Sequence, residues 1–366
     1  MDRPKRLLSL DGGGIRGIIA AEVLNKIEKI LLTHNSHWQC LGDYFDFIGG
    51  TSTGSFLAAG LASGMKVKDL LNFYIEKGDQ IFKQRWMCKI PIIGRLWTKF
   101  KSEPLEGNLQ KFFLDSSSNS LLFGSSELKT RLMIVSKNAT SGETWFFVND
   151  KKNKFFEKNA DLPVWQIIRA SSAAPTYFPP CTLQTENGPN EFIDGGLSPY
   201  NNPAFQLFLE ATWPEYGISW TPGKNNMLLI SVGTGFSVEI IPFPKARRFK
   251  ALSWAPYAID TFMDSANLQQ NHLLQLMSQE RADRNSSSST HPVTDYFQSL
   301  LTYHRYTISF DQERFKDLNL EDIDVEKVKP LDCIDQIQTL QRIGKKIAEP
   351  ITIEAFEGFL ADDQDA

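Results

Sequence analysis

The sequence predicts an α/β protein with a mainly parallel central sheet, because two strand–turn–helix units follow each other near its start. Residues 7–10 form a short apolar strand that runs into a glycine-rich turn and then an apolar helix over 18–32. A second strand over 45–49 runs into a Gly-Thr-Ser-Thr-Gly turn, which starts a helix over 53–64. Strands that alternate with helices are typical of right-handed crossovers between parallel strands.

Both helices suit packing against a sheet. The first has one broad apolar face at helical spacing, made of Ile18, Ile19, Val23, Leu24, Ile27, Ile30 and Leu31. The second is rich in Gly, Ala and Ser. Its small side chains let it lie close to the sheet and hold the serine at its start firmly.

The rest of the chain continues this alternation. We expect strands over 127–135, 144–148, 191–193, 227–232 and 303–310. We expect helices over 162–173, from 201–203 onward, over 255–281 and near the C-terminus. The long helix over 255–281 carries Ile259, Phe262, Met263, Leu273, Leu274 and Met277 on its apolar face. No linker divides the chain, so we expect one large domain with an appended C-terminal layer.

Composition excludes several classes of protein. With 366 residues, 42% of them hydrophobic and 22% charged, the chain is an ordinary globular one, and its net charge of −4 gives no nucleic-acid footprint. The four cysteines are scattered without C-x-x-C spacing, which predicts neither a zinc site nor a redox motif. No apolar signal segment precedes the first strand, and no run approaches 18 apolar residues. We therefore expect a cytoplasmic protein whose contact with a membrane is peripheral.

The turn at residues 50–54 fits the nucleophile-elbow pattern, with Ser52 as the nucleophile. Glycines are needed on both sides of such a serine because a side chain would crowd the tight turn or the helix. The start of the helix places backbone N–H groups and a positive dipole end near the serine oxygen.

The turn after the first strand, Asp11-Gly-Gly-Gly-Ile-Arg-Gly17, is the second element of the predicted site. Consecutive glycines expose backbone N–H groups, which can bind a phosphate or stabilise an oxyanion. The turn is neither a Walker loop nor a G-x-G-x-x-G fingerprint. Taken alone, it leaves nucleotide binding and oxyanion stabilisation open.

The third element is Asp194, which follows the short strand over 191–193 and precedes two glycines. Alone, this pattern indicates a turn, but beside a nucleophile it supplies a candidate base. A catalytic triad would need one of the five histidines in a suitable loop, and none of them lies in a glycine-bounded turn after a strand. A serine paired directly with a carboxylate is the more economical hypothesis, with Asp194 accepting the Ser52 proton.

Two basic and aromatic segments stand out in this acidic protein. Residues 81–102 lack acidic side chains and include Lys83, Arg85, Lys89 and Arg95 among apolar residues. Residues 243–254 add the basic residues Lys245, Arg247, Arg248 and Lys250 beside aromatic ones. Such segments suit an anionic lipid surface or a phosphate ligand, whereas a long loop whose aromatics pack on the domain is the structural alternative.

The motifs Asp11–Gly17, Gly50–Gly54 and Asp194-Gly-Gly, in this order and spacing, resemble those of the patatin-like phospholipases. The segment over 170–179, Ala-Ser-Ser-Ala-Ala-Pro-Thr-Tyr-Phe-Pro, is similar to that family as well. The resemblance implies a three-layer α/β/α fold. It also implies a core over residues 1–235 that carries the catalysis and a C-terminal helical layer over 236–366, packed together as one continuous domain.

The resemblance also implies a chemistry. Ser52 and Asp194 would form the catalytic dyad, the N–H groups of Gly12, Gly13 and Gly14 the oxyanion hole, and Arg16 would support this loop. The implied reaction is the hydrolysis of carboxylic esters of glycerophospholipids through an acyl-serine, without a metal or another cofactor.

In length and layout the chain is similar to bacterial cytosolic members of the family. Some of these are effectors of anti-phage defence that cyclic di- or trinucleotides activate and that degrade the cell's own inner membrane. The resemblance thus implies a nucleotide activator and a homo-oligomer on activation. A constitutive lipid hydrolase without nucleotide control and a catalytically silent phosphate-binding module are the alternatives.

Overall fold

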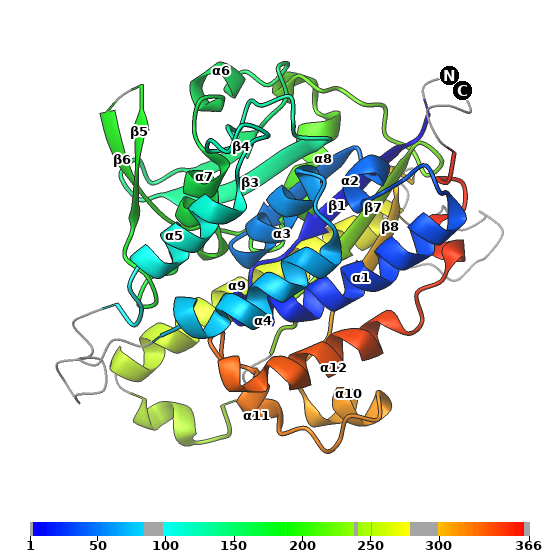
Figure 1. The fold of residues 1–366 in the computed structure, drawn as a ribbon. Coiled ribbons are helices and arrows are strands. Elements are labelled where there is room, and N and C mark those ends of the chain that lie inside the picture. The colour runs from blue at the N-terminus through cyan, green and yellow to red at the C-terminus, as the bar shows by residue number, and fades with distance from the viewer. Residues whose placement is uncertain are drawn as a thin grey trace.

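The computed structural model describes residues 3–83, 98–186, 188–237, 241–249, 251–278 and 299–361. These residues form a central sheet of eight strands in the order β5-β6-β3-β2-β1-β7-β8, with β4 also paired to β3 (Figure 1). The strands are β1 (Lys5–Leu10), β2 (Phe47–Thr51), β3 (Arg131–Asn138), β4 (Thr144–Val148), β5 (Cys181–Thr185), β6 (Gly188–Asp194), β7 (Met227–Val232) and β8 (Thr302–Tyr306). The run from β3 to β8 is parallel, and the pairs of β3 with β4 and β6, and of β5 with β6, are antiparallel. The predicted mainly parallel sheet is confirmed.

Helices cover both faces of the sheet. They are α1 (Gly17–His34), α2 (Leu41–Tyr44), α3 (Thr53–Ala62), α4 (Val67–Ile81), α5 (Glu103–Phe112), α6 (Phe156–Asn159), α7 (Val164–Ser171), α8 (Ala204–Thr212), α9 (Ala251–Ser278), α10 (Gln312–Asp317), α11 (Val325–Val328) and α12 (Ile337–Ala348). Within the described part of the chain, none is long and apolar enough to cross a bilayer.

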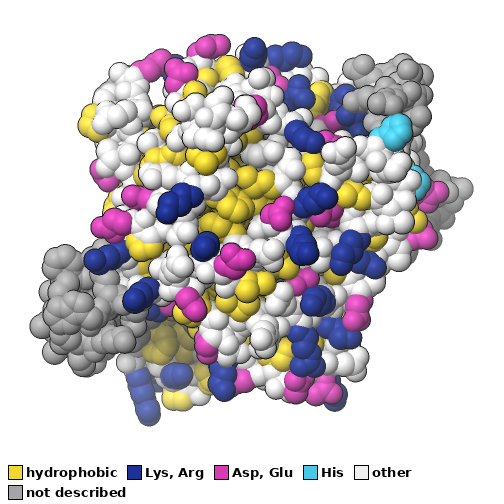
Figure 2. All heavy atoms as spheres, in the orientation of Figure 1, with side chains coloured by type: hydrophobic (Ala, Val, Ile, Leu, Met, Phe, Trp, Pro, Cys, Tyr) yellow, Lys and Arg dark blue, Asp and Glu magenta, His cyan; other side chains and the backbone are white. Residues whose placement is uncertain are grey.

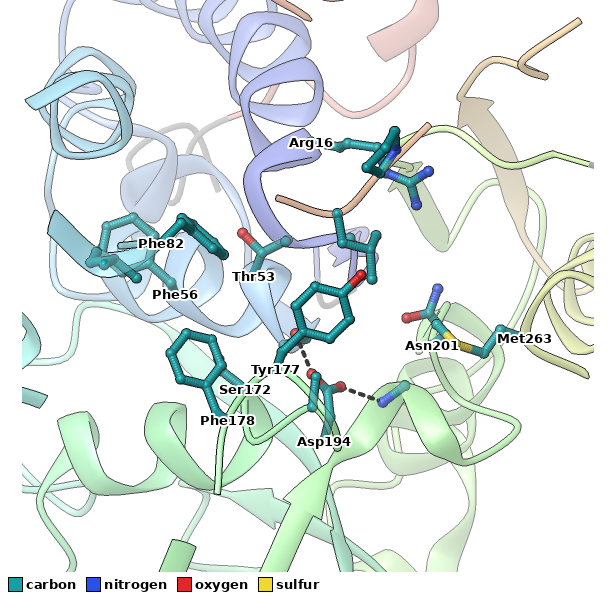
Figure 3. Close-up of a pocket in the computed structure, with 18 of the residues that line it drawn as sticks. Arg16, Thr53, Phe56, Phe82, Ser172, Tyr177, Phe178, Asp194, Asn201 and Met263 are labelled. Atoms are coloured by element: carbon teal, nitrogen blue, oxygen red, sulfur yellow. Dashed lines mark hydrogen bonds between the residues drawn. The ribbon is translucent and has the colours of Figure 1, made fainter. Parts of the chain in front are cut away.

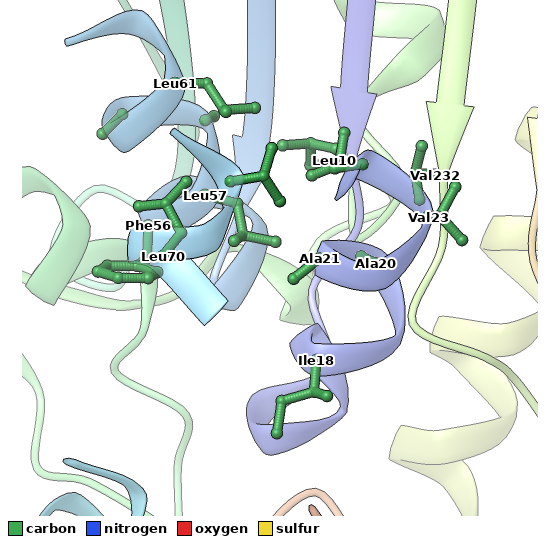
Figure 4. Packing of buried hydrophobic residues seen from close by; sticks show 14 of the residues in the cluster. Leu10, Ile18, Ala20, Ala21, Val23, Phe56, Leu57, Leu61, Leu70 and Val232 are labelled. Carbon is green, nitrogen blue, oxygen red and sulfur yellow. The ribbon is translucent and has the colours of Figure 1, made fainter. Parts of the chain in front are cut away.

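The side chains of β1 alternate between two hydrophobic clusters, one on each face of the sheet. Leu8 and Leu10 pack with α1, α3, α4 and α7, and Figure 4 shows this side around Leu10 and Leu57. Leu7, on the opposite face, packs with α8 and α9. Two covered faces make the three-layer α/β/α arrangement that the resemblance implied.

The C-terminal residues both cover the fold and enter it. Helix α12 lies against α1 so closely that a Cβ on Gly344 would come within 2.7 Å of the Ile19 carbonyl oxygen. Strand β8, however, pairs with β7 inside the central sheet, and α9 covers one face of that sheet. A division of the chain at residue 235 therefore stays a prediction.

Several boundaries differ from those expected. Strand β2 begins at Phe47 rather than at residue 45, because residues 41–44 form a helix that ends when the Phe45 N–H bonds the Leu41 carbonyl at 3.0 Å. Helices α4 and α5 and strand β5 were not predicted at all. Two residues expected on the apolar face of the long helix lie partly in solvent, since Phe262 is 47% and Leu273 36% exposed.

The strand register places the turns of the site side by side. Leu10 at the end of β1 is opposite both Gly50 of β2 and Val232 of β7. Asp194 at the end of β6 is opposite Ser136, in the strand that pairs with β2 on its other side. Four features therefore meet at one edge of the sheet. They are the glycine loop over residues 11–17, the serine turn over residues 50–54, the turn after β7, and Asp194.

A buried ion pair anchors the glycine loop to β8, the strand at one edge of the sheet. The Asp11 carboxylate accepts hydrogen bonds from both terminal nitrogens of Arg305 on β8, and the two side chains are 2% and 7% exposed. Arg305 also donates to Ser231 Oγ at 2.7 Å and to Asn267 Oδ1 at 3.1 Å. Strand β8 and helix α9 thus hold the first residue of the loop.

Arg305→Met should lower the free energy of unfolding by about 3–5 kcal/mol, because it leaves the Asp11 carboxylate buried and unpaired. Chemical denaturation measures this. The control is Arg342→Met, which removes the exposed pair with Asp322 and should have a much smaller effect. Equal effects of the two substitutions would contradict the anchoring role.

Candidate active site

Ser52 lies in a strained turn between β2 and α3. Its backbone has φ 53° and ψ −122°, a conformation that residues other than glycine rarely adopt. A Cβ on Gly50 would lie 2.2 Å from the Gly54 carbonyl oxygen, and one on Gly54 would lie 2.2 Å from the Leu10 carbonyl oxygen. The flanking glycines let the turn close, so the serine is presented above the edge of the sheet.

The Ser52 hydroxyl donates a hydrogen bond to Oδ2 of Asp194 at 2.6 Å. The other carboxylate oxygen accepts the N–H of Gly196 at 2.7 Å, and both bonds are drawn in Figure 3. Ser52 is 9% and Asp194 6% exposed. Burial raises the pKa of Asp194 to about 6, although the hydrogen bonds from Ser52 and Gly196 act in the opposite direction. The carboxylate is therefore a stronger base than an exposed one and is still mostly ionised at neutral pH.

Further hydrogen bonds fix the backbone of the serine. The Ser52 N–H donates to Ser171 Oγ at 2.8 Å, and the Ser171 hydroxyl donates to the Val135 carbonyl at 2.6 Å. The Ser55 hydroxyl donates to the Ser52 carbonyl at 2.6 Å. Ser171 was not singled out from the sequence, although it belongs to the 170–179 segment that carried part of the family resemblance.

The three glycines predicted as the oxyanion hole differ in their hydrogen bonding. The Gly12 N–H donates to the Asn201 carbonyl at 3.1 Å and is engaged in this structure. For the N–H groups of Gly13 and Gly14, both of which line the cavity beside Ser52, no acceptor is found among the described residues. Of the three predicted donors, Gly13 and Gly14 are therefore the two that are available.

Thr234 sets the direction of the Gly13 N–H. Its hydroxyl donates to the Gly12 carbonyl at 2.6 Å. In a trans peptide the carbonyl and the following N–H point in opposite directions. The bond from Thr234 thus turns the Gly13 N–H away from β7. Nothing in the sequence assigned this role to Thr234.

Arg16 connects the glycine loop to the C-terminal part of the chain. Its Nη1 donates to the Lys329 carbonyl at 3.0 Å, and its guanidinium lies over the Phe310 ring at 5.2 Å from the centroid. The neighbouring Ile15 N–H donates to the Leu331 carbonyl at 2.8 Å. These contacts fit the supporting role proposed for Arg16.

A cavity of about 600 Å³ opens at Ser52 and Asp194. Figure 3 shows its two sides, with aromatic rings on one side of the dyad and Arg16, Asn201 and Met263 on the other. The apolar side includes Phe56, Phe73, Ile81, Phe82, Leu109 and Phe178. The arrangement places the predicted nucleophile and base at the junction between a mainly apolar cavity and a polar rim.

The other predicted residues that the structure describes do not line the cavity. Lys83 is exposed, and Arg85, Lys89 and Arg95 fall outside the described residues. Lys245, Arg247 and Arg248 are exposed on a short 3-10 helix over 245–248 and do not line the cavity. None of the four histidines that the structure describes lines the cavity either.

The fold and the site define an α/β protein with a serine–aspartate pair at a strained turn beside an apolar cavity. Residues 8–208, more than half of the chain, match the model of the patatin-like phospholipase family. The chain belongs to this family, which confirms the resemblance seen in its motifs.

Curated relatives come from bacteria and plants. The chain is 32% identical over 244 residues to a cGAMP-activated phospholipase of Escherichia coli (strain TW11681), covering 64% of this chain and 63% of the relative. It is 30% identical over 237 residues to a cGAMP-activated phospholipase of Vibrio cholerae, covering 63% and 64%. Patatin-2-Kuras 3 of Solanum tuberosum is 30% identical over 269 residues, covering 68% and 65%. The chain thus spans somewhat less than two thirds of each of these relatives.

Asp194→Asn should stabilise the fold at pH 7.5, by up to about 3 kcal/mol. The pKa of Asp194 in the folded protein, about 6, lies above its ordinary value of 3.8, so the folded state binds this proton more tightly than the unfolded chain does. Ionisation of Asp194 therefore lowers the stability of the folded protein. This loss is roughly absent below pH 4 and complete above about pH 6, as the two pKa values require. The neutral asparagine avoids this loss.

Urea denaturation at pH 4 and at pH 7.5 tests this expectation, with the exposed carboxylate of Asp317 replaced in the control Asp317→Asn. The stability gain of Asp194→Asn should shrink at the lower pH. A gain that is absent, or that is equal at both pH values, would contradict it.

Proposed function

We propose that this protein is a serine lipid acyl hydrolase that cleaves carboxylic esters of membrane glycerophospholipids. The observation that carries the proposal is the 2.6 Å hydrogen bond from Ser52 Oγ to the buried Asp194 carboxylate, at a strained turn that opens on an apolar cavity. Membership of the patatin-like phospholipase family and relatives named as phospholipases support it.

In the proposed reaction, Asp194 accepts the Ser52 proton while Oγ attacks the ester carbonyl carbon. The N–H groups of Gly13 and Gly14 stabilise the negative charge on the carbonyl oxygen. The tetrahedral intermediate then collapses to an acyl-serine, and the leaving alcohol takes its proton from Asp194. Water, deprotonated by Asp194, attacks the acyl-serine, releases the fatty acid and regenerates Ser52.

The apolar side of the cavity supports a lipid substrate. The whole cavity has a volume of about 600 Å³, which lies within the usual range of ligand sites. Each buried methylene of an acyl chain would add roughly 0.8 kcal/mol of binding free energy. A catalytically silent phosphate-binding module explains neither the aromatic lining nor the paired Ser52 and Asp194.

We further propose that a cyclic di- or trinucleotide activates the enzyme and that it assembles into homo-oligomers when activated. This rests on the two bacterial relatives, whose names describe them as cGAMP-activated. The candidate contacts with the nucleotide or with the membrane are Lys83, Arg85, Lys89, Arg95, Lys245, Arg247 and Arg248. The enzyme would then be cytoplasmic and would act at the inner membrane. Constitutive hydrolysis without nucleotide control is the alternative.

Ser52→Ala should abolish fatty-acid release from phospholipid vesicles, because it removes the hydroxyl that donates to Asp194 and acts as the proposed nucleophile. Fluorophosphonate labelling should mark the parent protein and not this variant. The control is Ser63→Ala, which changes a half-buried serine at the end of α3. Labelling that persists in Ser52→Ala would exclude Ser52 as the nucleophile.

A panel of cyclic di- and trinucleotides should contain one that raises fatty-acid release at least tenfold. Mass photometry of the same samples should show a larger assembly with that nucleotide. Full release without any nucleotide would support the constitutive alternative.

A further inference from the structure

Helix α9 carries large apolar side chains on two opposite sides. Leu274 and Met277 are buried in the core, at 0% and 7% exposure. On the other side Trp254 is 40%, Phe262 47% and Leu268 46% exposed. These three side chains form a partly exposed apolar strip on the outer side of the long amphipathic helix.

Residues 241–249, just before α9, extend this strip with exposed basic and aromatic side chains. Phe243 is 87% exposed, and the Arg247 guanidinium lies over its ring at 5.5 Å from the centroid. Trp254 packs against the rings of Phe249 and Tyr257 at centroid distances of 5.1 and 5.5 Å. Lys245, Arg247 and Arg248 are exposed, and residues 241–250 contain no Asp or Glu. Figure 2 shows Lys and Arg side chains projecting at the lower left, where Figure 1 places this segment.

The same helix reaches the candidate active site. Met263, Asp264 and Asn267 of α9 line the cavity, and Figure 3 shows Met263 beside Asn201. From Trp254 to Leu268 the helix rises about 21 Å, at roughly 1.5 Å per residue. One helix thus presents an apolar strip to the outside and part of the cavity wall to the inside.

We propose that the outer side of α9 and the short helix before it, with Phe243, Arg247, Arg248, Trp254, Phe262 and Leu268, dock on the surface of an anionic phospholipid bilayer. Basic residues at one end attract anionic headgroups, and aromatic rings partition into the headgroup region. Docking in this way places helix α9, which also lines the cavity, against the lipids. The inference rests on the proposed function, because it assigns the surface that delivers the substrate to the same site.

A bilayer fits this surface better than a small phosphate ligand does. The exposed aromatic and aliphatic side chains extend along the helix for about 21 Å, beyond the basic end. A cyclic nucleotide bound at Lys245, Arg247 and Arg248 would leave most of the strip in water. A bilayer covers its whole length and matches both its apolar character and its charge.

The test measures sedimentation with vesicles of phosphatidylcholine, with and without phosphatidylglycerol. All proteins carry Ser52→Ala so that the lipids stay intact. The variant Phe243→Ser with Arg247→Glu should bind the anionic vesicles at least about tenfold more weakly. The matched control is Phe155→Ser with Lys154→Glu, since Phe155 is 46% exposed and the Lys154 ammonium lies 5.0 Å from its ring centroid. This control should bind like the parent.

Activity measurements with Ser52 intact give a second readout. The Phe243/Arg247 variant should hydrolyse a soluble short-chain nitrophenyl ester at the parental rate and vesicle lipid at least about tenfold more slowly. Parental vesicle binding by the variant would overturn the proposal, and so would equal losses in the control. The proposal would also be overturned if the variant kept its vesicle binding but lost nucleotide activation or self-association. If no ester is cleaved by any protein, the proposed function fails while the binding test still decides on the docking surface.

Discussion

The parallel pairing of β1 with β2 and β7 is the constraint on which the site depends. Leu10 lies opposite Gly50 and Val232, so three turns leave the sheet at the same edge. The helix after β2 then starts so close to β1 that Gly54 has no room for a side chain beside the Leu10 carbonyl. This close packing holds the glycine loop against the serine turn, and a strained φ at Ser52 accompanies it. The proposed nucleophile and amide donors are thus arranged by backbone geometry.

Two buried aspartates, each followed by glycines, show how the surroundings separate a structural role from a chemical one. Asp11 is held by Arg305, which neutralises its charge and fixes the loop. Asp194 has a hydroxyl and an amide as its described hydrogen-bond partners. Without a cation, burial leaves the Asp194 carboxylate with a raised pKa and hence with the basicity that the proposed proton transfer needs.

The C-terminal part of the chain supports the loop that the N-terminal motifs build. Arg305 comes from β8, and the carbonyls of Lys329 and Leu331 accept hydrogen bonds from Arg16 and Ile15. Asn267 of α9 contacts both Arg305 and the cavity. A helix that we infer to meet the membrane is therefore connected by hydrogen bonds to the base of the glycine loop.

The sequence by itself determined the local features, because hydrophobic periodicity and glycine-rich turns act over a few residues. The α/β class, the serine turn and the candidate base at Asp194 were all predictable in this way. Only the tertiary structure decided the partners that lie far apart in the chain, such as Arg305 for Asp11 and Thr234 for the Gly12 carbonyl. It also decided that Asn201 engages the Gly12 amide and that Phe262 faces outward. Such contacts depend on which strands pair and on which side of a helix meets the sheet, and neighbouring residues do not encode that choice.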